Sequence, residues 1–404
     1  MSSDHRGAKE VTRRGLLQGF AGAAAASSLP VFPVPALAQG ARFKVGFMLP
    51  YTGTLAKLGQ SIDNGFRLYV EQKGGRLGGR QVAFVQVDDE SKPETVPDNM
   101  SRLIGRDKAD VVVGSVHSGV AMAMVKVARD TKTMLIIPNA GANDATGLLC
   151  APNIFRTSFS NWQPNFPMGR VMYEAGHRNV ATVTWRYTAG QEMVGGFKEG
   201  FATMGGKIVE DLVLPFPDVE FQALITRLTT LKPDAVFAFF AGGGAVRFVK
   251  DYEAAGLKRS IPLYGPGFLT DGTIEAQGPA ADGIRTTLHY ADNLDNPANK
   301  AFLAAFKKRV GQEGNIYAVQ GFDTAALLDI GLGATGGDWA AHDAVITAME
   351  GAKIDSPRGP LSFSRAHNPI QNIYLREARK GRNALVSIAQ EAVTDPAYGC
   401  RLGA

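Results

Sequence analysis

The sequence predicts an α/β protein built from two doubly wound, Rossmann-like lobes. Short apolar, β-branched runs alternate with amphipathic helical stretches, and this pattern starts afresh near residue 179. Alternation of this kind implies parallel strands with helices on both faces of the sheet. The chain has 404 residues, which is enough for two domains that each have their own core.

The first set of alternating elements covers residues 43–138. The run FKVGFML at 43–49 predicts a strand, and helical spacing from about Lys57 to Lys73 predicts the helix that follows it. The same pairing recurs, with strands at 81–89, 111–115 and 133–138 and with helices near 94–106 and from about residue 118.

The second set follows the same pattern, and the C-terminal part then departs from it. The predicted strands are 179–185, 207–214, 234–240 and 261–265, with helices near 191–204, 221–230 and 246–255. A helical region over 297–351 comes next, and the last predicted strands are 359–363, 371–378 and 384–389. We expect these late strands to rejoin the earlier sheets.

Residues 1–38 have the pattern of an export signal. Arg13 and Arg14 precede an Ala/Gly-rich apolar run, and the small-residue site Ala36-Leu37-Ala38 follows. The paired arginines resemble a twin-arginine signal, so we expect a periplasmic protein cleaved after about Ala38. A membrane anchor is the alternative, and it is disfavoured by the three prolines between residues 30 and 35.

Charge and cysteine content exclude several classes of protein. Residues 1–38 carry four Lys or Arg and two Asp or Glu, so the net charge of +5 falls to +3 once they are removed. No basic cluster interleaved with aromatics remains, so we expect no nucleic-acid partner.

Cys150 and Cys400 are a disulfide candidate for an oxidising compartment, although they could also be two separate buried thiols.

The strand ends carry the most information, because doubly wound sheets bind ligands at the carboxyl ends of their strands. Ser118 follows the strand at 111–115 and is a natural N-cap, and small neighbours leave room for a carboxylate at the helix N-terminus. His117 is a second candidate for the same anion. The alternative is a plain cap with no ligand.

Other strand ends offer polar backbone and aromatic walls. Pro138 stops its strand, and the residues after it suit a polar ligand end, although an ordinary turn would look the same. Phe239 and Phe240 face opposite sides of one strand, so one of them belongs to the core, and we place Phe240 among the candidates. The further candidates at strand ends and loops are Tyr51, Asn139, Ala140, Gly141, Trp185, Tyr187, Phe268 and Tyr317.

Catalytic and metal-binding patterns are missing from the sequence. The residues around Ser118 lack both outer glycines of a nucleophile elbow, and AGGGA at 241–245 lacks the spacing of a dinucleotide-binding loop. The cysteines and the six histidines show no zinc spacing. We therefore expect no enzyme, no metal and no cofactor.

Several segments resemble the periplasmic solute-binding proteins of ABC importers, in the branched-chain (hydrophobic) amino acid class. The matching segments include VGFMLPYTGTLAKLGQSIDNGF, ADVVVGSVHSGVAMAMVKVA, NIFRTSFS and GPLSFSRAHNPIQNIYL. The resemblance implies a type I periplasmic binding fold that closes on its ligand by a hinge. It also implies lobe 1 as 42–158 plus 291–363, lobe 2 as 159–290 plus 364–404, a monomer, and permease subunits in the inner membrane as partners.

Site residues of that family match unevenly. Ser118 matches the serine that holds the ligand carboxylate, whereas the positions of a threonine and a glutamate that hold the ammonium are Gly141 and Gly267 here. Ala241 stands where those relatives have a tyrosine. A buried ammonium without a counter-charge is costly, and the deleted side chains are expected to leave space.

The resemblance therefore predicts a small aromatic carboxylate as the ligand. VHSGVAMAMVK, NAGAN and FFAGGGA also resemble the subgroup that takes up aromatic acids such as benzoate and hydroxybenzoates. The alternatives are a branched-chain or other hydrophobic amino acid as the ligand, and a two-lobe ligand-sensing receptor that signals to a protein partner.

Overall fold

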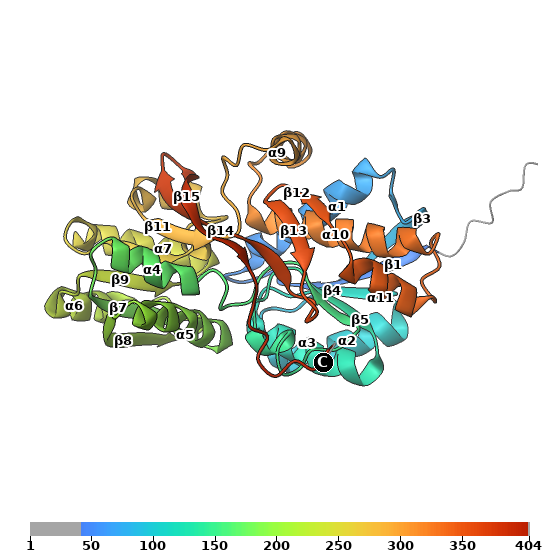
Figure 1. Ribbon diagram of the computed structural model, residues 1–404, viewed down its shortest axis with the longest axis horizontal. Helices are drawn as coiled ribbons and strands as arrows, with labels where there is room; N and C mark the ends of the chain where they lie inside the picture. The colour runs from blue at the N-terminus through green and yellow to red at the C-terminus, as the bar shows by residue number, and fades with distance from the viewer. Residues whose placement is uncertain (1–41, 403–404) are drawn as a thin grey trace, which may run out of the picture. The chain divides into compact units, whose positions relative to one another are not determined.

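The first sheet has six strands in the order β2-β3-β1-β4-β5-β6. The computed structural model describes residues 42–402 (Figure 1). The strands are β1 Phe43–Leu49, β2 Arg76–Leu77, β3 Arg80–Asp88, β4 Val111–Gly114, β5 Met134–Ile137 and β6 Ile154–Arg156. All neighbours are parallel except the β2–β3 hairpin. The helices of this part are α1 Ala56–Gln72, α2 Val96–Ser101 with a π-helical turn over Arg102–Arg106, and α3 Ser118–Thr131.

The second sheet has nine strands in the order β12-β13-β14-β11-β10-β9-β7-β8, with β15 paired to β14. Its strands are β7 Asn179–Arg186, β8 Lys207–Pro215, β9 Ala235–Phe239, β10 Leu263–Pro266, β11 Arg285–Leu288, β12 Ile354–Ser356, β13 Gly359–Phe363, β14 Pro369–Arg379 and β15 Arg382–Val393. The helices are α4 Phe166–Glu174, α5 Thr188–Thr203, α6 Gln222–Leu231, α7 Gly242–Ala254 and α8 Ile274–Gln277. The run β8-β7-β9-β10-β11 is parallel, and β14 joins it antiparallel.

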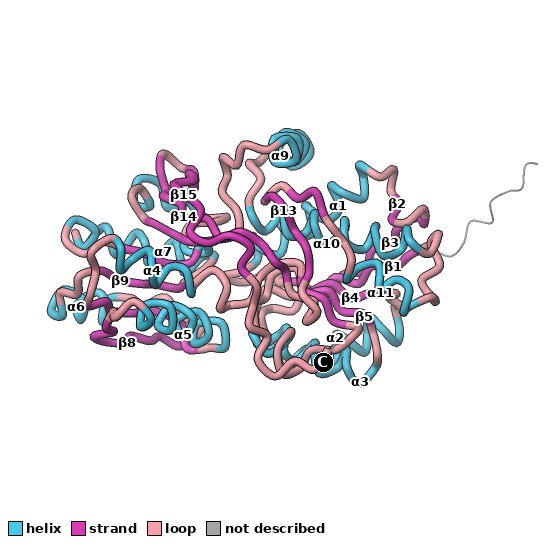
Figure 2. Tube along the Cα trace, in the orientation of Figure 1, coloured by secondary structure: helices cyan, strands magenta, loops and turns pink. Residues whose placement is uncertain are grey.

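The predicted fold class is confirmed, and the C-terminal strands rejoin the second sheet. The helical region over 297–351 divides into α9 Pro297–Val310, α10 Ile316–Ala334 and α11 His342–Glu350. Figure 2 shows helices on the outer faces of both groups of strands. The sequence did not predict β2, β6, β11 or β12, which are two to four residues long and contain polar residues in place of the continuous apolar run that identifies four-residue strands such as β4 and β5. The proposed lobe boundaries stay a prediction.

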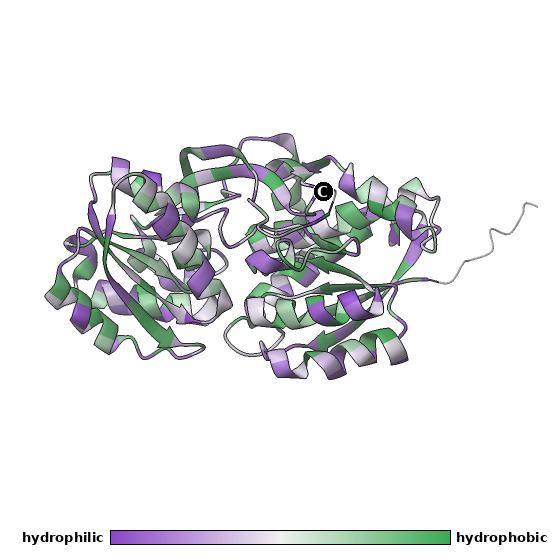
Figure 3. Cartoon of the chain, turned by 60° about the horizontal axis from the view of Figure 1, so that its bottom comes forward, coloured by the Kyte–Doolittle hydropathy of each residue, from purple (hydrophilic) through white to green (hydrophobic). Residues whose placement is uncertain are grey.

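The central strands of each sheet are buried on both faces by apolar packing. In the first sheet, Phe47 stacks on Phe84 with ring centroids 5.6 Å apart, and in the second, Phe197 stacks on Phe237 at 4.2 Å. Figure 3 shows the sheet strands mostly in the hydrophobic colour, while the helices outside them also carry hydrophilic residues. This accounts for the nearly continuous apolar runs that the sequence shows at its strands.

Helices α1 and α10 approach each other very closely. A Cβ at Gly65 of α1 would lie 1.8 Å from the carbonyl oxygen of Ala318, and a Cβ at Gly321 of α10 would lie 2.0 Å from that of Ile62. Both positions therefore need glycine for α1 and α10 to pack. The first turns of these two helices reach the candidate site described below.

Buried polar side chains fix the segments that connect the two sheets. Arg358 donates to the carbonyl oxygens of Thr157 and Ser158 and pairs with Asp323 at 2.9 Å. Gln163 donates to the carbonyl oxygens of Pro369 and Val393, at 2.8 and 2.9 Å. These bonds satisfy backbone groups that burial would otherwise leave unpaired.

The chain end is tied to a loop of the first part. Cys150 and Cys400 form a disulfide with their Cα atoms 5.6 Å apart. The predicted export signal over residues 1–38 lies outside the described residues. Within residues 42–402, every helix is too short or too polar to cross a membrane.

Candidate ligand-binding site

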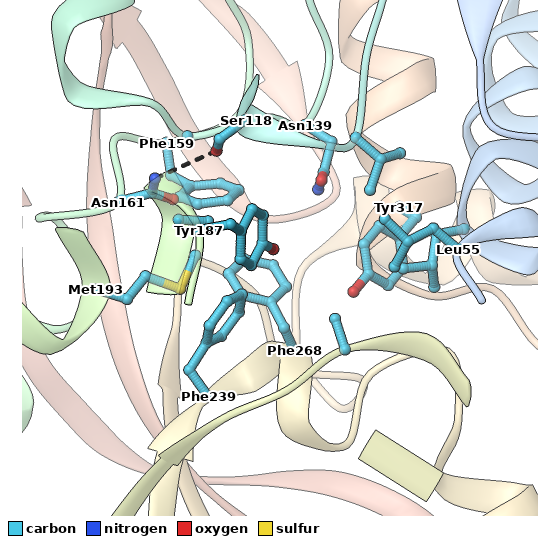
Figure 4. A pocket seen from close by; sticks show the side chains of 15 residues that line it. Leu55, Ser118, Asn139, Phe159, Asn161, Tyr187, Met193, Phe239, Phe268 and Tyr317 are labelled. Atoms are coloured by element: carbon cyan, nitrogen blue, oxygen red, sulfur yellow. Dashed lines mark hydrogen bonds between the residues drawn. The ribbon is translucent and has the colours of Figure 1, made fainter. Parts of the chain in front are cut away.

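A cavity lies at the carboxyl ends of the parallel strands and takes residues from both parts of the chain (Figure 4). The cavity itself has a volume of only about 20 Å³, and the empty space in and around it, which includes open solvent, amounts to about 320 Å³. The lining residues are Leu55, Leu58, Val116, Ser118, Asn139, Gly141, Phe159, Asn161, Tyr187, Ala189, Met193, Phe239, Ala241, Phe268 and Tyr317.

Five helices begin at this cavity. Leu55, Tyr187 and Ala241 are the N-cap residues of α1, α5 and α7, and none of the three has a side-chain cap. Ser118 is the first residue of α3, and Tyr317 is the second residue of α10. Each N-terminus carries a partial positive charge of roughly half an electron on its free N–H groups. The five termini therefore contribute positive potential to the cavity, although no cationic side chain of the described residues lines it.

The described residues that line the cavity include no Asp, Glu, Lys or Arg. Their polar side chains are Ser118, Asn139, Asn161, Tyr187 and Tyr317. An anion here would be held by backbone dipoles and neutral donors, as at other helix N-termini. An ammonium would meet no carboxylate on the cavity surface.

Ser118 does not have the role in its helix that the sequence predicts. The N-cap of α3 is His117, which has an extended backbone and whose Nδ1 accepts a hydrogen bond from the N–H of Val120 at 3.3 Å. Ser118 is the first helical residue, so its hydroxyl is not used as a cap. Its Oγ accepts a long bond of 3.4 Å from Nδ2 of Asn161, whose buried Oδ1 has no hydrogen-bond partner.

His117 contacts the second part of the chain, and no anion contact is needed to explain its position. Its ring stacks on Tyr187 at 4.7 Å and lies 4.8 Å from Phe216. Burial lowers the pKa of His117 to about 4, which keeps the ring neutral. A neutral ring is what the cap requires, because Nδ1 must keep its lone pair to accept from Val120.

Aromatic rings form the walls between the polar groups. Phe159 and Phe268 lie 4.7 Å apart, and Tyr187 stacks on Phe239 at 6.2 Å. Tyr317 lies 6.2 Å from Phe268. Flat apolar surfaces of this kind suit a planar ring.

The two glycines at the family's ammonium-binding positions do not leave open space, which corrects our expectation. A Cβ at Gly141 would lie 2.3 Å from Oδ1 of Asn161 and 2.5 Å from the ring of Phe159. A Cβ at Gly267 would lie 2.2 Å from Nη2 of Arg376. Groups of the protein itself therefore fill both places.

Two carboxylates lie behind the cavity wall, and both are engaged. Glu192 accepts from Nδ2 of Asn161 at 2.7 Å and from the N–H of Asn143 at 3.0 Å, and burial raises its pKa. Asp271 pairs with Arg376 at 2.7 Å, and both side chains are fully buried. Burial raises the pKa of Asp271, and Arg376 opposes that shift.

Of the sequence candidates, the structure brings Ser118, Asn139, Gly141, Tyr187, Ala241, Phe268 and Tyr317 to the cavity. Five others, Tyr51, Ala140, Trp185, Phe240 and Gly267, do not line it. The Tyr51 hydroxyl donates to Asp63 of α1 and accepts from Gln86 of β3, and neither partner lines the cavity. Ala140 is buried, and its backbone N–H donates a hydrogen bond to the carbonyl oxygen of Ser115.

Phe240 is a correction with a simple cause. Phe239 lines the cavity, and strand alternation sends Phe240 into the core against Trp185, Phe221 and Phe248. Trp185 is fully buried in the same cluster and donates from Nε1 to the carbonyl of Asp218. These two residues therefore support the wall from behind.

Sequence reasoning missed eight lining residues. Phe159 and Asn161 follow the three-residue strand β6, so the strand-end argument would have found them if that strand had been predicted. Leu55 and Leu58 begin α1, and Phe239 required the correct parity. The remaining three are Val116, Ala189 and Met193.

The fold and the site together define a binding protein: two α/β parts that share one cavity at their strand ends. A family model for periplasmic binding proteins matches residues 42–383, and the chain belongs to that family. The structurally similar members are solute-binding proteins of ABC transporters and not enzymes.

Two solved structures and one curated relative illustrate the similarity. A solute-binding protein from R. palustris, solved with benzoate, is 52% identical, covers 89% of this chain and 100% of its own, and has a TM-score of 0.88. A second, from Rhodopseudomonas palustris with p-hydroxybenzoic acid, is 30% identical over 89% of this chain and 99% of its own, with a TM-score of 0.82. Leu/Ile/Val-binding protein homolog 6 of Brucella melitensis is 31% identical over 88% of this chain and 93% of its own length.

Proposed function

We propose that this protein is the extracytoplasmic solute-binding component of an ABC importer and that its ligand is a small aromatic carboxylate of the benzoate or hydroxybenzoate type. One observation carries the proposal: five helix N-termini surround a cavity with aromatic walls, and no acidic side chain lines it among the described residues. The solved relatives that hold benzoate and p-hydroxybenzoic acid support the same class of ligand.

The carboxylate is placed at the start of α3. The N–H groups in the first turn of a helix lack intrahelical partners, and that of Val120 is already used by His117. The backbone N–H groups of Ser118 and Gly119 and the hydroxyl of Ser118 are then the donors for the anion. Small residues at this turn let the carboxylate approach the backbone.

The ring is placed between Phe159, Phe268, Tyr187 and Phe239. Burial of an apolar ring against these walls contributes roughly 25 cal/mol per Å² of apolar surface removed from water. His117, the N-cap of α3, stacks on Tyr187, the N-cap of α5. Closure of these two helix N-termini around a ligand would therefore also form this ring contact. Export to the periplasm, a monomeric state, hinge closure and delivery to permease subunits belong to the same proposal.

A hydrophobic amino acid is the competing ligand, because several curated relatives are named Leu/Ile/Val-binding proteins. An α-ammonium group would need a carboxylate near the start of α3. Glu192 bonds Asn161, which also bonds Ser118, and its carboxylate is already held by Asn161 and Asn143. Desolvation of an unpaired ammonium costs several kcal/mol, so we favour the carboxylic acid.

Isothermal titration of the ligand-free protein tests the proposal, with benzoate, 4-hydroxybenzoate and leucine as the ligands. We expect binding of at least one aromatic acid and none of leucine at the same concentration. Ser118→Ala should weaken binding of the acid by about 1–3 kcal/mol, because a buried charge-assisted partner is lost. Ser260→Ala is the matched control, since Ser260 lies at the end of a surface turn and bonds only Leu257. Tight leucine binding without aromatic-acid binding would overturn the ligand assignment.

A further inference from the structure

Tyr317 carries a buried hydroxyl that the protein itself does not satisfy. The side chain is 1% exposed, it lines the cavity, and its Oη has no hydrogen-bond partner among the described residues. Burial, and then the nearby charge of Asp271, raises the pKa of Tyr317 well above its usual value. The group is therefore a neutral phenol that can donate and accept one hydrogen bond each.

Asn139 is held from behind by a buried chain of polar groups. Its Nδ2 donates to Oε1 of Gln320 at 2.7 Å, and Nε2 of Gln320 lies 3.1 Å from Nε2 of His289. His289 is fully buried, and burial together with Arg358 and Arg376 lowers its pKa well below the usual value. With Nε2 of Gln320 as the donor in this contact, Nε2 of His289 accepts, which requires the neutral tautomer that is protonated at Nδ1.

The direction of this chain decides what Asn139 offers to a ligand. Because Nδ2 is used by Gln320, the amide presents its oxygen to the cavity, and within residues 42–402 that oxygen accepts no hydrogen bond. Gln320 lies three residues after Tyr317 on α10, so the two side chains leave neighbouring turns of one helix face. Asn139 and Tyr317 both line the cavity.

Figure 4 shows how these groups are distributed around the cavity. Ser118 and Asn161 lie on one side, Tyr317 lies on the other, and the amide of Asn139 points into the space between. The ring of Phe159 lies beside Ser118 and Asn161, and the rings of Tyr187 and Phe268 lie nearer the middle of the view. A planar acid anchored at Ser118 would thus direct the far part of its ring toward Asn139 and Tyr317.

We propose that Asn139 and Tyr317 form a subsite for a ring hydroxyl remote from the carboxylate, and that Gln320 and His289 are its positioning residues. The hydroxyl donates to Oδ1 of Asn139 and accepts from Oη of Tyr317. This inference rests on the proposed function, since it requires a carboxylate at Ser118. An unsubstituted ring would leave both protein groups buried without partners, which is costly.

Titration calorimetry of the ligand-free protein with four acids tests the subsite. The acids are 4-hydroxybenzoate, 3-hydroxybenzoate, benzoate and 4-methylbenzoate, the last of which has a substituent of similar size without the hydrogen bonds. We expect one hydroxylated acid to bind about 10- to 100-fold more tightly than benzoate and 4-methylbenzoate. Benzoate binding as tightly as both hydroxylated acids would overturn the subsite and leave the proposed function intact. Failure of all four acids to bind would overturn the proposed function and the subsite with it.

Three variants locate the effect, with the ratio of the benzoate and hydroxybenzoate dissociation constants as the readout. Tyr317→Phe removes one hydroxyl, and we expect the ratio to fall by about tenfold. Gln320→Met should also lower the ratio, whereas a purely structural role would weaken all acids alike. Tyr252→Phe is the control, because Tyr252 is buried at the far end of α7 and bonds Ile261, so its ratio should equal that of the wild type. If Tyr317→Phe kept the wild-type ratio of the two dissociation constants, the subsite would be wrongly placed.

Discussion

Gly267 lies directly against the buried Arg376–Asp271 ion pair, and Gly267→Ala tests how firmly that pair is held. The added Cβ would lie 2.2 Å from Nη2 of Arg376, whereas ordinary contacts begin near 3.4 Å, so the guanidinium must move by about 1.2 Å. Arg376 cannot move freely, because it is fully buried and donates to Asp271 at 2.7 Å and to the carbonyl of Tyr290 at 2.8 Å. A shift of this size breaks the ion pair, and breaking a buried pair costs about 3–5 kcal/mol. That is a large part of a total stability of about 5–15 kcal/mol.

Urea unfolding followed by circular dichroism measures this loss. Gly195→Ala is the matched control, because Gly195 lies within α5 with open space around its Cα, and alanine there should stabilise the helix by about 0.5–1 kcal/mol. We expect a loss of about 3 kcal/mol or more for Gly267→Ala. A loss below about 1 kcal/mol would refute the reasoning, because it would mean that the Arg376–Asp271 pair adapts without cost.

Two further predictions concern stability. Replacing both Cys150 and Cys400 by serine should lower the free energy of unfolding by about 2–5 kcal/mol, because the disulfide closes a loop of 250 residues; an oxidised wild type no more stable than the variant would contradict this. The stabilisation from neutral His117 is complete above its unfolded pKa near 6.5 and is lost as the pH falls toward its folded pKa of about 4. Lowering the pH from 7 to 5 should therefore reduce the free energy of unfolding of the wild type by about 2 kcal/mol more than that of His117→Asn, measured by denaturation at both pH values. Asparagine keeps a cap acceptor but does not titrate. Equal losses in both proteins would refute this assignment.

The fold could be predicted from the sequence because its elements are regular and long. Apolar runs such as 43–49 and 179–185 lie within β1 and β7, and the restart of the pattern corresponds to the start of the second sheet. The short strands β6 and β11 contain three and four residues, and too little periodicity remains to identify them. Their strand ends, and with them Phe159 and Asn161, were therefore missed.

The candidate site was predicted in outline, and the errors have local causes. The sequence predicts Ser118 at the N-cap because serine is favoured there, whereas the histidine before it has the extended backbone and makes the cap bond. Phe239 and Phe240 differ only in strand parity, which a one-residue shift reverses. The sequence predicts empty space at Gly141 and Gly267, but tertiary packing brings Asn161 and Arg376 to those places.

The central claim is that the cavity binds its ligand through a negative charge on an aromatic body. The most direct measurement compares 4-hydroxybenzoate with 4-hydroxybenzamide by isothermal titration, since the two molecules share shape and ring substituent and differ in charge. We expect the acid to bind at least about tenfold more tightly, corresponding to 1.4 kcal/mol or more from the helix N-termini. An amide that binds as well as the acid would contradict the account.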